Sequence, residues 1–531
     1  MIPLAVTENM IFNSIAFFVF IGIFFPLYFS LKGRARLFLC LIASYFFYGW
    51  WDERFLALVA FSTCVDYFVG LKLDNTEDQP TRKKLLIASM VVNLGFLAIF
   101  KYFNFFIKSF QEMLTGFGYD GSMHSLKIIL PVGISFYTFQ SMSYTIDVYR
   151  KEIAVEKDFI RFSTFISFFP QLVAGPIVRA SDFLPQFQKD REFSWDRVTA
   201  GTGQIIWGFF KKVAVADSLA PFVDQCFQAP ETFGSLHLLI GVIFYSFQIY
   251  CDFSGYSDIA IGLARIMGFD FPDNFKKPYF SRNYSEFWTR WHISLSSWLR
   301  DYLYIPLGGN RGGTFASWFI LLVFMILTVF LTGWWWLAVI YVLSSIGTYF
   351  YMQKSEYNNK NAFNYMNLMN TMLLGGLWHG ASWAFVFWGF LHGSYQVVQR
   401  LAGPIWNKIL DTIRIPKFFK DVLAMGLVYS STCFAWIYFR APDFDVASQV
   451  ISGIASLEAF NFGSVINKFW VIKGVMVIGI LLLVEILDVR LTLWKVIQTN
   501  PAFRIISFVL LLWAIAFFGS FGANSFIYFQ F

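Results

Sequence analysis

Long apolar stretches follow one another along almost the whole chain, and only short polar segments separate them. About 20 apolar residues are enough for an α-helix to cross the hydrocarbon layer of a membrane, which is about 30 Å thick. The pattern therefore predicts an all-α, polytopic membrane protein with about 11 to 14 membrane segments, some of them re-entrant or interfacial because their windows are too short or too long for one crossing. The windows are 10–30, 37–50, 55–71, 85–100, 126–149, 160–177, 202–227, 236–267, 286–305, 317–352, 371–400, 422–439, 471–487 and 504–520.

Composition supports a membrane protein, since 57% of the residues are apolar and 14% are charged, against about 25% charged residues in soluble domains. Basic residues gather in the segments 31–36, 72–84 and 150–161, which the positive-inside rule places in the cytoplasm. The N-terminus, the 50–54 turn and the 101–124 segment are then expected outside, with the first window as an uncleaved anchor. The net charge of +7 follows from this topology and does not indicate nucleic-acid binding.

No linker or repeat divides the chain, so one transmembrane domain is expected over 1–531, with a core at about 126–400. An active site must then lie inside the membrane body, where irregular backbone is tolerated only against protein or a cavity. Two stretches carry ionisable residues within apolar sequence, 248–313 and 373–394, and such residues are candidates for function. In the first stretch, Asp252 and Tyr256 are candidate tunnel-lining residues.

His379 is the first candidate for catalysis. It lies in LLGGLWHGASW, where glycines on both sides leave room for a substrate or another backbone, and Trp378 and Trp383 are expected to wall the site. The alternative is a packing histidine hydrogen-bonded to a neighbouring helix.

His292 is the second candidate. If 286–305 is one helix, then His292, Ser296 and Arg300 recur every four residues and form a polar stripe along a cavity. An equally good alternative is a helix at the membrane surface with its charges in water.

The other histidines are expected to have lesser roles. On one continuous helix, His392 would lie about 20 Å from His379 and on another face, which indicates a structural or access-channel role. His124 and His237 are expected at the surface. The cysteines occur singly, which favours reduced packing residues; they are Cys40, Cys64, Cys226, Cys251 and Cys433.

Motifs of other enzyme classes are missing from the sequence: it has no GxSxG, HExxH, GxxxxGK or clustered Cys/His pattern, and no metal site is predicted. A histidine base in a sealed tunnel fits acyl transfer from a thioester to a hydroxyl, because imidazole can take up the hydroxyl proton near neutral pH.

At these same segments the chain resembles the membrane-bound O-acyltransferase (MBOAT) family, and within it the bacterial alginate O-acetylation branch. The most specific stretches are NFKKPYFSRNYSEFWTRWHISLSSWLRDYLYIPLGGNRGG (274–313) and LLGGLWHG within 371–383. The others are 129–150, 168–179, 208–217, 250–269, 434–444 and 526–531.

The resemblance implies an MBOAT fold with a central funnel or tunnel in the bacterial inner membrane, His379 as the catalytic histidine and His292 as a second polar position of the core. It also implies cytoplasmic acyl-CoA, here acetyl-CoA, as the donor substrate, with no bound cofactor. The expected partners are membrane lipid, a periplasmic or membrane-anchored SGNH-type acetyltransferase and, through it, an exported polysaccharide. Whether the histidine acts as a base or as a transient acyl carrier is left open.

One departure from the pattern of this branch is the insertion 314–362, whose apolar run is broken by TGWWW and is long enough for a helical hairpin with an even number of crossings. The insertion leaves the polysaccharide open. The alternatives are D-alanyl transfer to teichoic acid and, outside enzymes, a transporter or a scaffold of a polysaccharide export complex.

Overall fold

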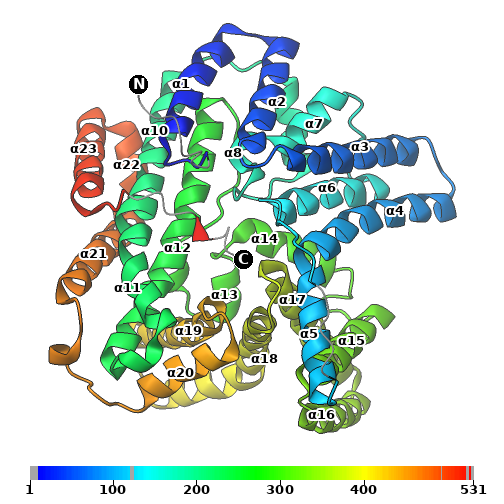
Figure 1. Ribbon diagram of the computed structural model, residues 1–531, viewed down its shortest axis with the longest axis vertical. Helices are drawn as coiled ribbons and strands as arrows, with labels where there is room; N and C mark the ends of the chain where they lie inside the picture. Colours follow the sequence, from blue (N-terminus) through cyan, green and yellow to red (C-terminus); the bar gives the residue numbers. More distant parts are fainter. Residues whose placement is uncertain (1–9, 120–124, 492, 522–525, 528–531) are drawn as a thin grey trace. The chain divides into compact units, whose positions relative to one another are not determined.

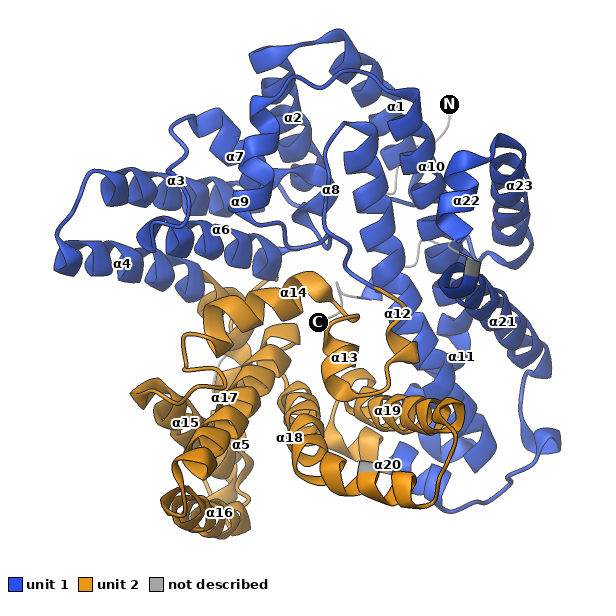
Figure 2. Cartoon of the chain, turned by 180° about the vertical axis from the view of Figure 1, so that it is seen from behind, with its two compact units in different colours: residues 1–95, 131–275, 449–531 blue, residues 96–130, 276–448 orange. Residues whose placement is uncertain are grey.

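The computed structural model describes residues 10–119, 125–491, 493–521 and 526–527, and no β-strand occurs among them. The all-α architecture predicted from the apolar windows is confirmed (Figure 1). The chain divides into two compact units, shown in Figure 2, and each unit is assembled from separate stretches of the sequence. The single domain predicted over 1–531 stays a prediction.

Unit 1 comprises 1–95, 131–275 and 449–531. Its longer helices are α1 (Ile15–Ser30), α2 (Gly33–Gly49), α3 (Arg54–Asp74), most of α4 (Gln79–Leu97), α6 (Ile134–Tyr149), α7 (Phe159–Ser167), α10 (Trp195–Phe209), α11 (Asp217–Gln228), α12 (Ser235–Ile266), α21 (Lys468–Leu491) and α23 (Pro501–Phe518). Its shorter helical segments are α8 (Phe169–Leu172), α9 (Ala180–Phe183), η2 (Leu184–Gln188), η3 (Phe210–Ala216), η4 (Pro230–Thr232), η7 (Phe462–Ser464) and α22 (Leu493–Thr499).

Unit 2 comprises 96–130 and 276–448 and carries the two candidate histidines. Its helices are η1 (Ala98–Tyr102), α5 (Phe103–Gly116), η5 (Pro278–Phe280), α13 (Tyr284–Trp288), α14 (Ile293–Leu299), η6 (Arg300–Tyr304), α15 (Phe315–Thr332), α16 (Trp336–Gln353), α17 (Glu356–His379), α18 (Trp383–Thr412) and α19 (Lys417–Arg440). Helix α20 (Phe444–Ala455) begins in this unit and ends in unit 1.

Seven helical stretches of the described chain are long and apolar enough to cross a membrane. They are Arg54–Asp74, Gln79–Gly116, Ser235–Ile266, Phe315–Thr332, Lys417–Arg440, Lys468–Arg490 and Pro501–Phe518. In Pro501–Phe518 none of the apolar window is buried within the protein, so lipid is the solvent for these side chains. The chain is a multi-pass membrane protein, and the total of 11 to 14 segments stays a prediction.

Small residues bring the helices of unit 1 into close contact. A side chain on Gly201 of α10 would come within 2.6 Å of the carbonyl oxygen of Gly262 on α12, and one on Gly208 within 2.7 Å of that of Gly255. Such glycine contacts let two helical backbones approach closely within a membrane.

The insertion 314–362 contains two helices of 18 residues each, α15 and α16. They meet at Gly333, whose φ of 68° lies in the left-handed region that favours glycine. An even number of membrane crossings by this pair stays a prediction.

Candidate functional site

His379 is the last residue of α17, and the chain reverses direction directly after it. Gly380 is fully extended (φ −163°, ψ 155°), and the Oγ of Ser382 accepts the N–H of Ala384 at the start of α18. The window 371–400, interpreted as one helix in the sequence, is therefore two helices joined by a short turn. His379 lies at the corner of this hairpin.

The glycines before His379 serve the contact between the two helices. A side chain on Gly376 would come within 2.3 Å of the carbonyl oxygen of Phe385, and one on Gly389 within 2.2 Å of that of Met372. A side chain on Gly380 would meet the ring of Phe385 at 2.1 Å. Of the two possibilities that the glycines suggested, the structure therefore shows the close approach of another backbone and side chain.

His292 lies in a break between α13 and α14, so the predicted single helix over 286–305 is wrong. Its backbone is left-handed (φ 42°, ψ 55°), which is uncommon for a residue other than glycine, and its C=O accepts the N–H of Ser296. Such strained residues cluster at functional sites, where the surrounding structure holds them in place. The break lies before α14, so Ser296 and Arg300 still follow His292 on one helical stretch, but Arg300 is exposed and ion-paired with Asp301. The predicted polar stripe along a cavity stays a prediction.

The loop before His292 is fixed by charge. Glu286 accepts hydrogen bonds from the backbone and side chain of Arg282 and, at 2.7 Å, from Arg290, and the C=O of Arg290 accepts the N–H of Lys276. Burial raises the pKa of Glu286, but the hydrogen bonds from Arg282 and the charges of the two arginines outweigh burial and leave the pKa below its usual range. The carboxylate is therefore ionised at neutral pH and ties this loop together.

The structure brings His292 and His379 together in unit 2. Their ring centroids are 6.4 Å apart, and the two residues are 0% and 3% exposed. The ring of Trp378 lies 5.1 Å from that of His379 and 5.9 Å from that of His292, while Trp388 and Phe439 lie 5.0 and 5.3 Å from His379. The two imidazoles thus lie in one buried cluster of aromatic side chains, which we call the compartment of His379.

Trp383, the other predicted wall residue, is directed toward a different helix. Its indole Nε1 donates to the Oγ of Ser109 on α5 at 3.0 Å, and its ring lies 5.3 Å from that of Phe105. Trp383 therefore joins α18 to α5.

Lys101 and Tyr102 are the site neighbours that the sequence analysis missed. The Nζ of Lys101 donates to the carbonyl oxygens of Trp378 (2.6 Å) and His379 (3.1 Å), and the hydroxyl of Tyr102 donates to that of Leu377 (2.9 Å). A lysine inside an apolar helix is a signal that could have found the first of them.

His392 approaches the same compartment because α17 and α18 are separate helices. Its ring lies 4.6 Å from that of Trp388, which also packs against His379. His392 is fully buried, and neither ring nitrogen has a hydrogen-bond partner in the described part of the chain. The distance of about 20 Å expected on one continuous helix does not apply.

Asp252 and Tyr256 belong to unit 1, where they lie beside a buried lysine. The Nζ of Lys212 donates to Asp252 at 2.6 Å and to Asp217 at 2.8 Å, and the other carboxylate oxygen of Asp252 accepts the N–H of Ile527 at 2.7 Å. Buried charges are stable only when they are paired in this way.

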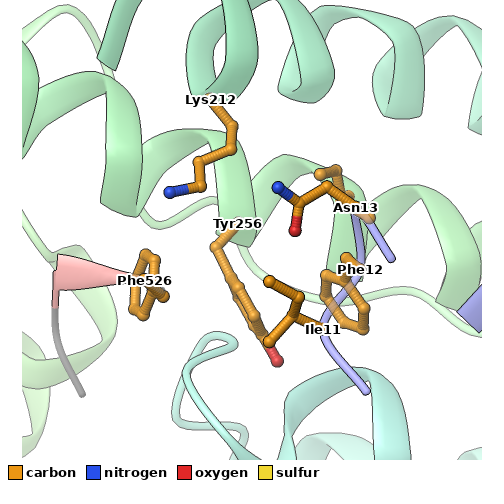
Figure 3. Close-up of a pocket in the computed structure, with 7 residues that line it drawn as sticks. Ile11, Phe12, Asn13, Lys212, Tyr256 and Phe526 are labelled. Carbon is orange, nitrogen blue, oxygen red and sulfur yellow. The ribbon is translucent and has the colours of Figure 1, made fainter. Parts of the chain in front are cut away.

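A small cavity lies beside this lysine (Figure 3). Its volume of about 20 Å³ has room for about one water molecule. It is lined by Ile11, Phe12, Asn13, Lys212, Tyr256, Ile259 and Phe526. The predicted place of Asp252 and Tyr256 on a tunnel wall stays a prediction.

Further expectations from the sequence concern residues outside this site. His237 is buried (1% exposed) between the rings of Phe222 and Phe233, each 4.3 Å away, so its predicted surface role is wrong. His124 and the last four residues of the 526–531 motif lie outside the described residues. Among the described residues no disulfide joins the five cysteines; four of them are buried and Cys64 is partly exposed.

Comparisons with known proteins identify the class of enzyme. Residues 149–365, a range that includes His292, match the model of the membrane-bound O-acyltransferase family. The chain is 39% identical to a Pseudomonas putida protein named probable alginate O-acetylase AlgI, over 86% of this chain and 81% of the relative. It is 32% identical to the peptidoglycan O-acetyltransferase of Helicobacter pylori, over 85% of this chain and 81% of the relative. It is 26% identical to the teichoic acid D-alanyltransferase of Bacillus subtilis, over 59% of this chain and 69% of the relative. With its apolar helices and its similarity to these enzymes, the chain belongs to the membrane-bound O-acyltransferase family and is an O-acyltransferase.

Proposed function

We propose that this O-acyltransferase passes an acetyl group from cytoplasmic acetyl-CoA across the bacterial inner membrane for O-acetylation of an exported polysaccharide such as alginate. The observation that carries the proposal is the pair of buried imidazoles, His292 and His379, in a chain that is similar over most of its length to a named alginate O-acetylase.

The chemistry requires one group that takes up a proton where little water is present. His379 acts as the base: its imidazole takes the proton of the acceptor hydroxyl while the hydroxyl oxygen attacks the thioester carbonyl. The C–S bond then breaks, and the CoA sulfur leaves with the proton from the imidazolium. If His379 is instead a transient acyl carrier, its ring nitrogen attacks the thioester carbonyl, the C–S bond breaks, and CoA leaves as the thiol with the ring proton. The hydroxyl oxygen then attacks the acetyl-imidazole, the N–C bond breaks, and the hydroxyl proton returns to the ring.

The aromatic walls and His292 support this reaction in different ways. Trp378, Trp388 and Phe439 pack around the imidazole of His379 and reduce the access of water, which would otherwise hydrolyse the thioester. His292, whose ring lies 6.4 Å from that of His379 and whose backbone is strained, contacts the reacting groups beside His379 in this proposal.

A partner completes the reaction in this proposal. A periplasmic or membrane-anchored acetyltransferase of the SGNH type receives the acetyl group and esterifies the polysaccharide, so the contact of this chain with the glycan is indirect. Membrane lipid surrounds the exposed apolar helices.

The second candidate function is D-alanyl transfer to teichoic acid, which the similarity to the Bacillus subtilis enzyme favours. The identity is lower and covers less of the chain than in the O-acetylating relatives, so acetyl transfer is the better supported reaction.

The test is deletion of the gene in its host, followed by measurement of ester-linked acetate and ester-linked D-alanine in the exported polysaccharide, the peptidoglycan and the teichoic acid. We expect the deletion to remove acetate from the exported polysaccharide and complementation to restore that acetate. Loss of D-alanine esters with unchanged acetate would establish the second candidate, and loss of acetate from peptidoglycan alone would contradict the proposed acceptor.

A further inference from the structure

The end of α17 is held by two side chains from a different part of unit 2. The last four C=O groups of an α-helix have no partner within the helix, and here the extended Gly380 prevents any continuation. Lys101 and Tyr102 supply the missing donors, because their side chains donate hydrogen bonds to the carbonyl oxygens of Leu377, Trp378 and His379. We call these two residues the α17 clamp.

The backbone around the clamp is irregular at the same point. Lys101 and Tyr102 are the last two residues of the π-helix η1, which interrupts the long apolar stretch Gln79–Gly116. A π-helical turn contains an extra residue and often occurs at functional sites. Through this turn, two consecutive side chains reach the same helix end.

The charge of Lys101 suits its position. A cation is stabilised at the C-terminus of a helix, where the aligned peptide dipoles leave partial negative charge. The ammonium group also lies 5.9 Å from the centroid of the Trp378 ring, and that ring packs against both His379 and His292. Lys101 therefore contacts the backbone of His379 and one wall of its compartment.

We propose that Lys101 and Tyr102 are positioning residues, which fix the backbone at the end of α17 and thereby orient the imidazole of His379 for acyl transfer. The inference rests on the proposed role of His379. It does not require either residue to touch the substrate.

A displaced base has a kinetic signature. Misplacement of a catalytic group by about 1 Å can cost about 10²-fold in rate. An interaction that serves the transition state lowers kcat and leaves KM nearly unchanged. If the clamp only stabilised the fold, its loss would lower the amount of folded protein without changing kcat per folded molecule.

The experiment uses the full chain in permeabilised cells that lack the chromosomal copy, with radiolabelled acetyl-CoA as the probe. The rate of transfer to glycan is measured against acetyl-CoA concentration and normalised to the protein in the membrane. Lys101→Met removes both hydrogen bonds and the charge at similar size, and Lys101→Arg restores a cation with several donors. Lys108→Met is the matched control, because Lys108 is an exposed lysine on α5, 3.7 Å from Glu112.

If the clamp orients His379, Lys101→Met should lower kcat by about 10- to 100-fold, with KM within about twofold of the wild-type value. Lys101→Arg should recover most of the rate, and Lys108→Met should equal wild type. Wild-type kcat in Lys101→Met, with His379→Ala inactive, would overturn the clamp and leave the proposed function intact. Activity in His379→Ala would overturn the catalytic role of His379, and the clamp with it, without touching the acetyl transfer that the gene deletion tests.

A milder variant keeps the test decisive if Lys101→Met does not reach the membrane. Tyr102→Phe removes one oxygen atom, and its matched control is Tyr119→Phe at an exposed tyrosine just beyond α5. Tyr102→Phe should lower kcat by at least about threefold at matched protein level. The wild-type value in Tyr102→Phe would contradict the inference.

Discussion

The centroids of the imidazole rings of His292 and His379 lie 6.4 Å apart, although 87 positions of sequence separate the two residues and neither sits in the middle of a helix. His292 occupies the break between α13 and α14, and His379 ends α17. Residues at helix ends can approach each other more freely than residues within a helix, since the backbone there is not committed to the regular hydrogen-bond pattern. The candidate site of this family member is built from two such ends.

Replacement of His292 separates the effect of its imidazole from the effect of its backbone. We expect both His292→Ala and His292→Asn to lower acetylation, because both remove the ring beside His379. His292→Ala should also lower thermal stability more than His292→Asn, since Asn accepts the left-handed conformation more easily. Acetylation at matched protein level and thermal unfolding of the purified variants check the two parts. Normal acetylation in both variants would remove His292 from the site.

Two glycine substitutions test whether close packing of α17 and α18 is needed. Gly376→Ala places a methyl group 2.3 Å from the carbonyl oxygen of Phe385, so it should destabilise the hairpin by about 1–3 kcal/mol and lower activity. Gly403→Ala on α18 meets no atom within 4 Å and should be neutral or slightly stabilising, because Ala favours the helix by about 1 kcal/mol over Gly. Equal unfolding temperatures for the two variants would contradict this account of the hairpin.

Substitution of His392 is expected to be tolerated, in contrast to substitution of the other two histidines. Its ring nitrogens are buried without hydrogen-bond partners, which costs free energy, and its ring packs among aromatic side chains. His392→Phe keeps an aromatic ring and removes the unsatisfied polar atoms, so we expect unchanged or higher stability. His392→Ala should be mild in its effect on acetylation compared with His379→Ala. A loss of acetylation in His392→Phe as large as that in His379→Ala would give His392 a direct part in the chemistry.

The sequence allowed the helical class and the two histidines to be predicted, because apolar windows and ionisable residues within them are local signals. His379 was identified from its glycines, although their role proved to be the contact with Phe385 and Gly389. His292 was identified from a helix over 286–305 that is in fact broken just before it. The structure therefore corrects part of the reasoning, and the catalytic roles of the two histidines stay predictions.

The helix breaks and the clamp could not be predicted, for two physical reasons. Apolar windows report hydrophobicity, and the sequence on both sides of Gly380 is mostly apolar whether the helix continues or reverses. The contacts of Lys101 with Trp378 and His379 join positions more than 270 residues apart, so they depend on tertiary packing that no local pattern reports. The pairing of Lys212 with Asp252 in unit 1 likewise depends on tertiary packing.

The most direct test of the account is the acetate content of the exported glycan in cells that carry His379→Ala or His379→Gln in place of the wild-type chain, at matched protein level in the membrane. Removal of a general base usually costs about 10²- to 10⁴-fold in rate, so both variants should insert normally and leave no detectable acetylation. Gln retains polar hydrogen-bonding groups but cannot take up the hydroxyl proton, so it separates base chemistry from packing. Near-normal acetylation in either variant would contradict the catalytic role of His379 and would favour a scaffold in a polysaccharide export complex.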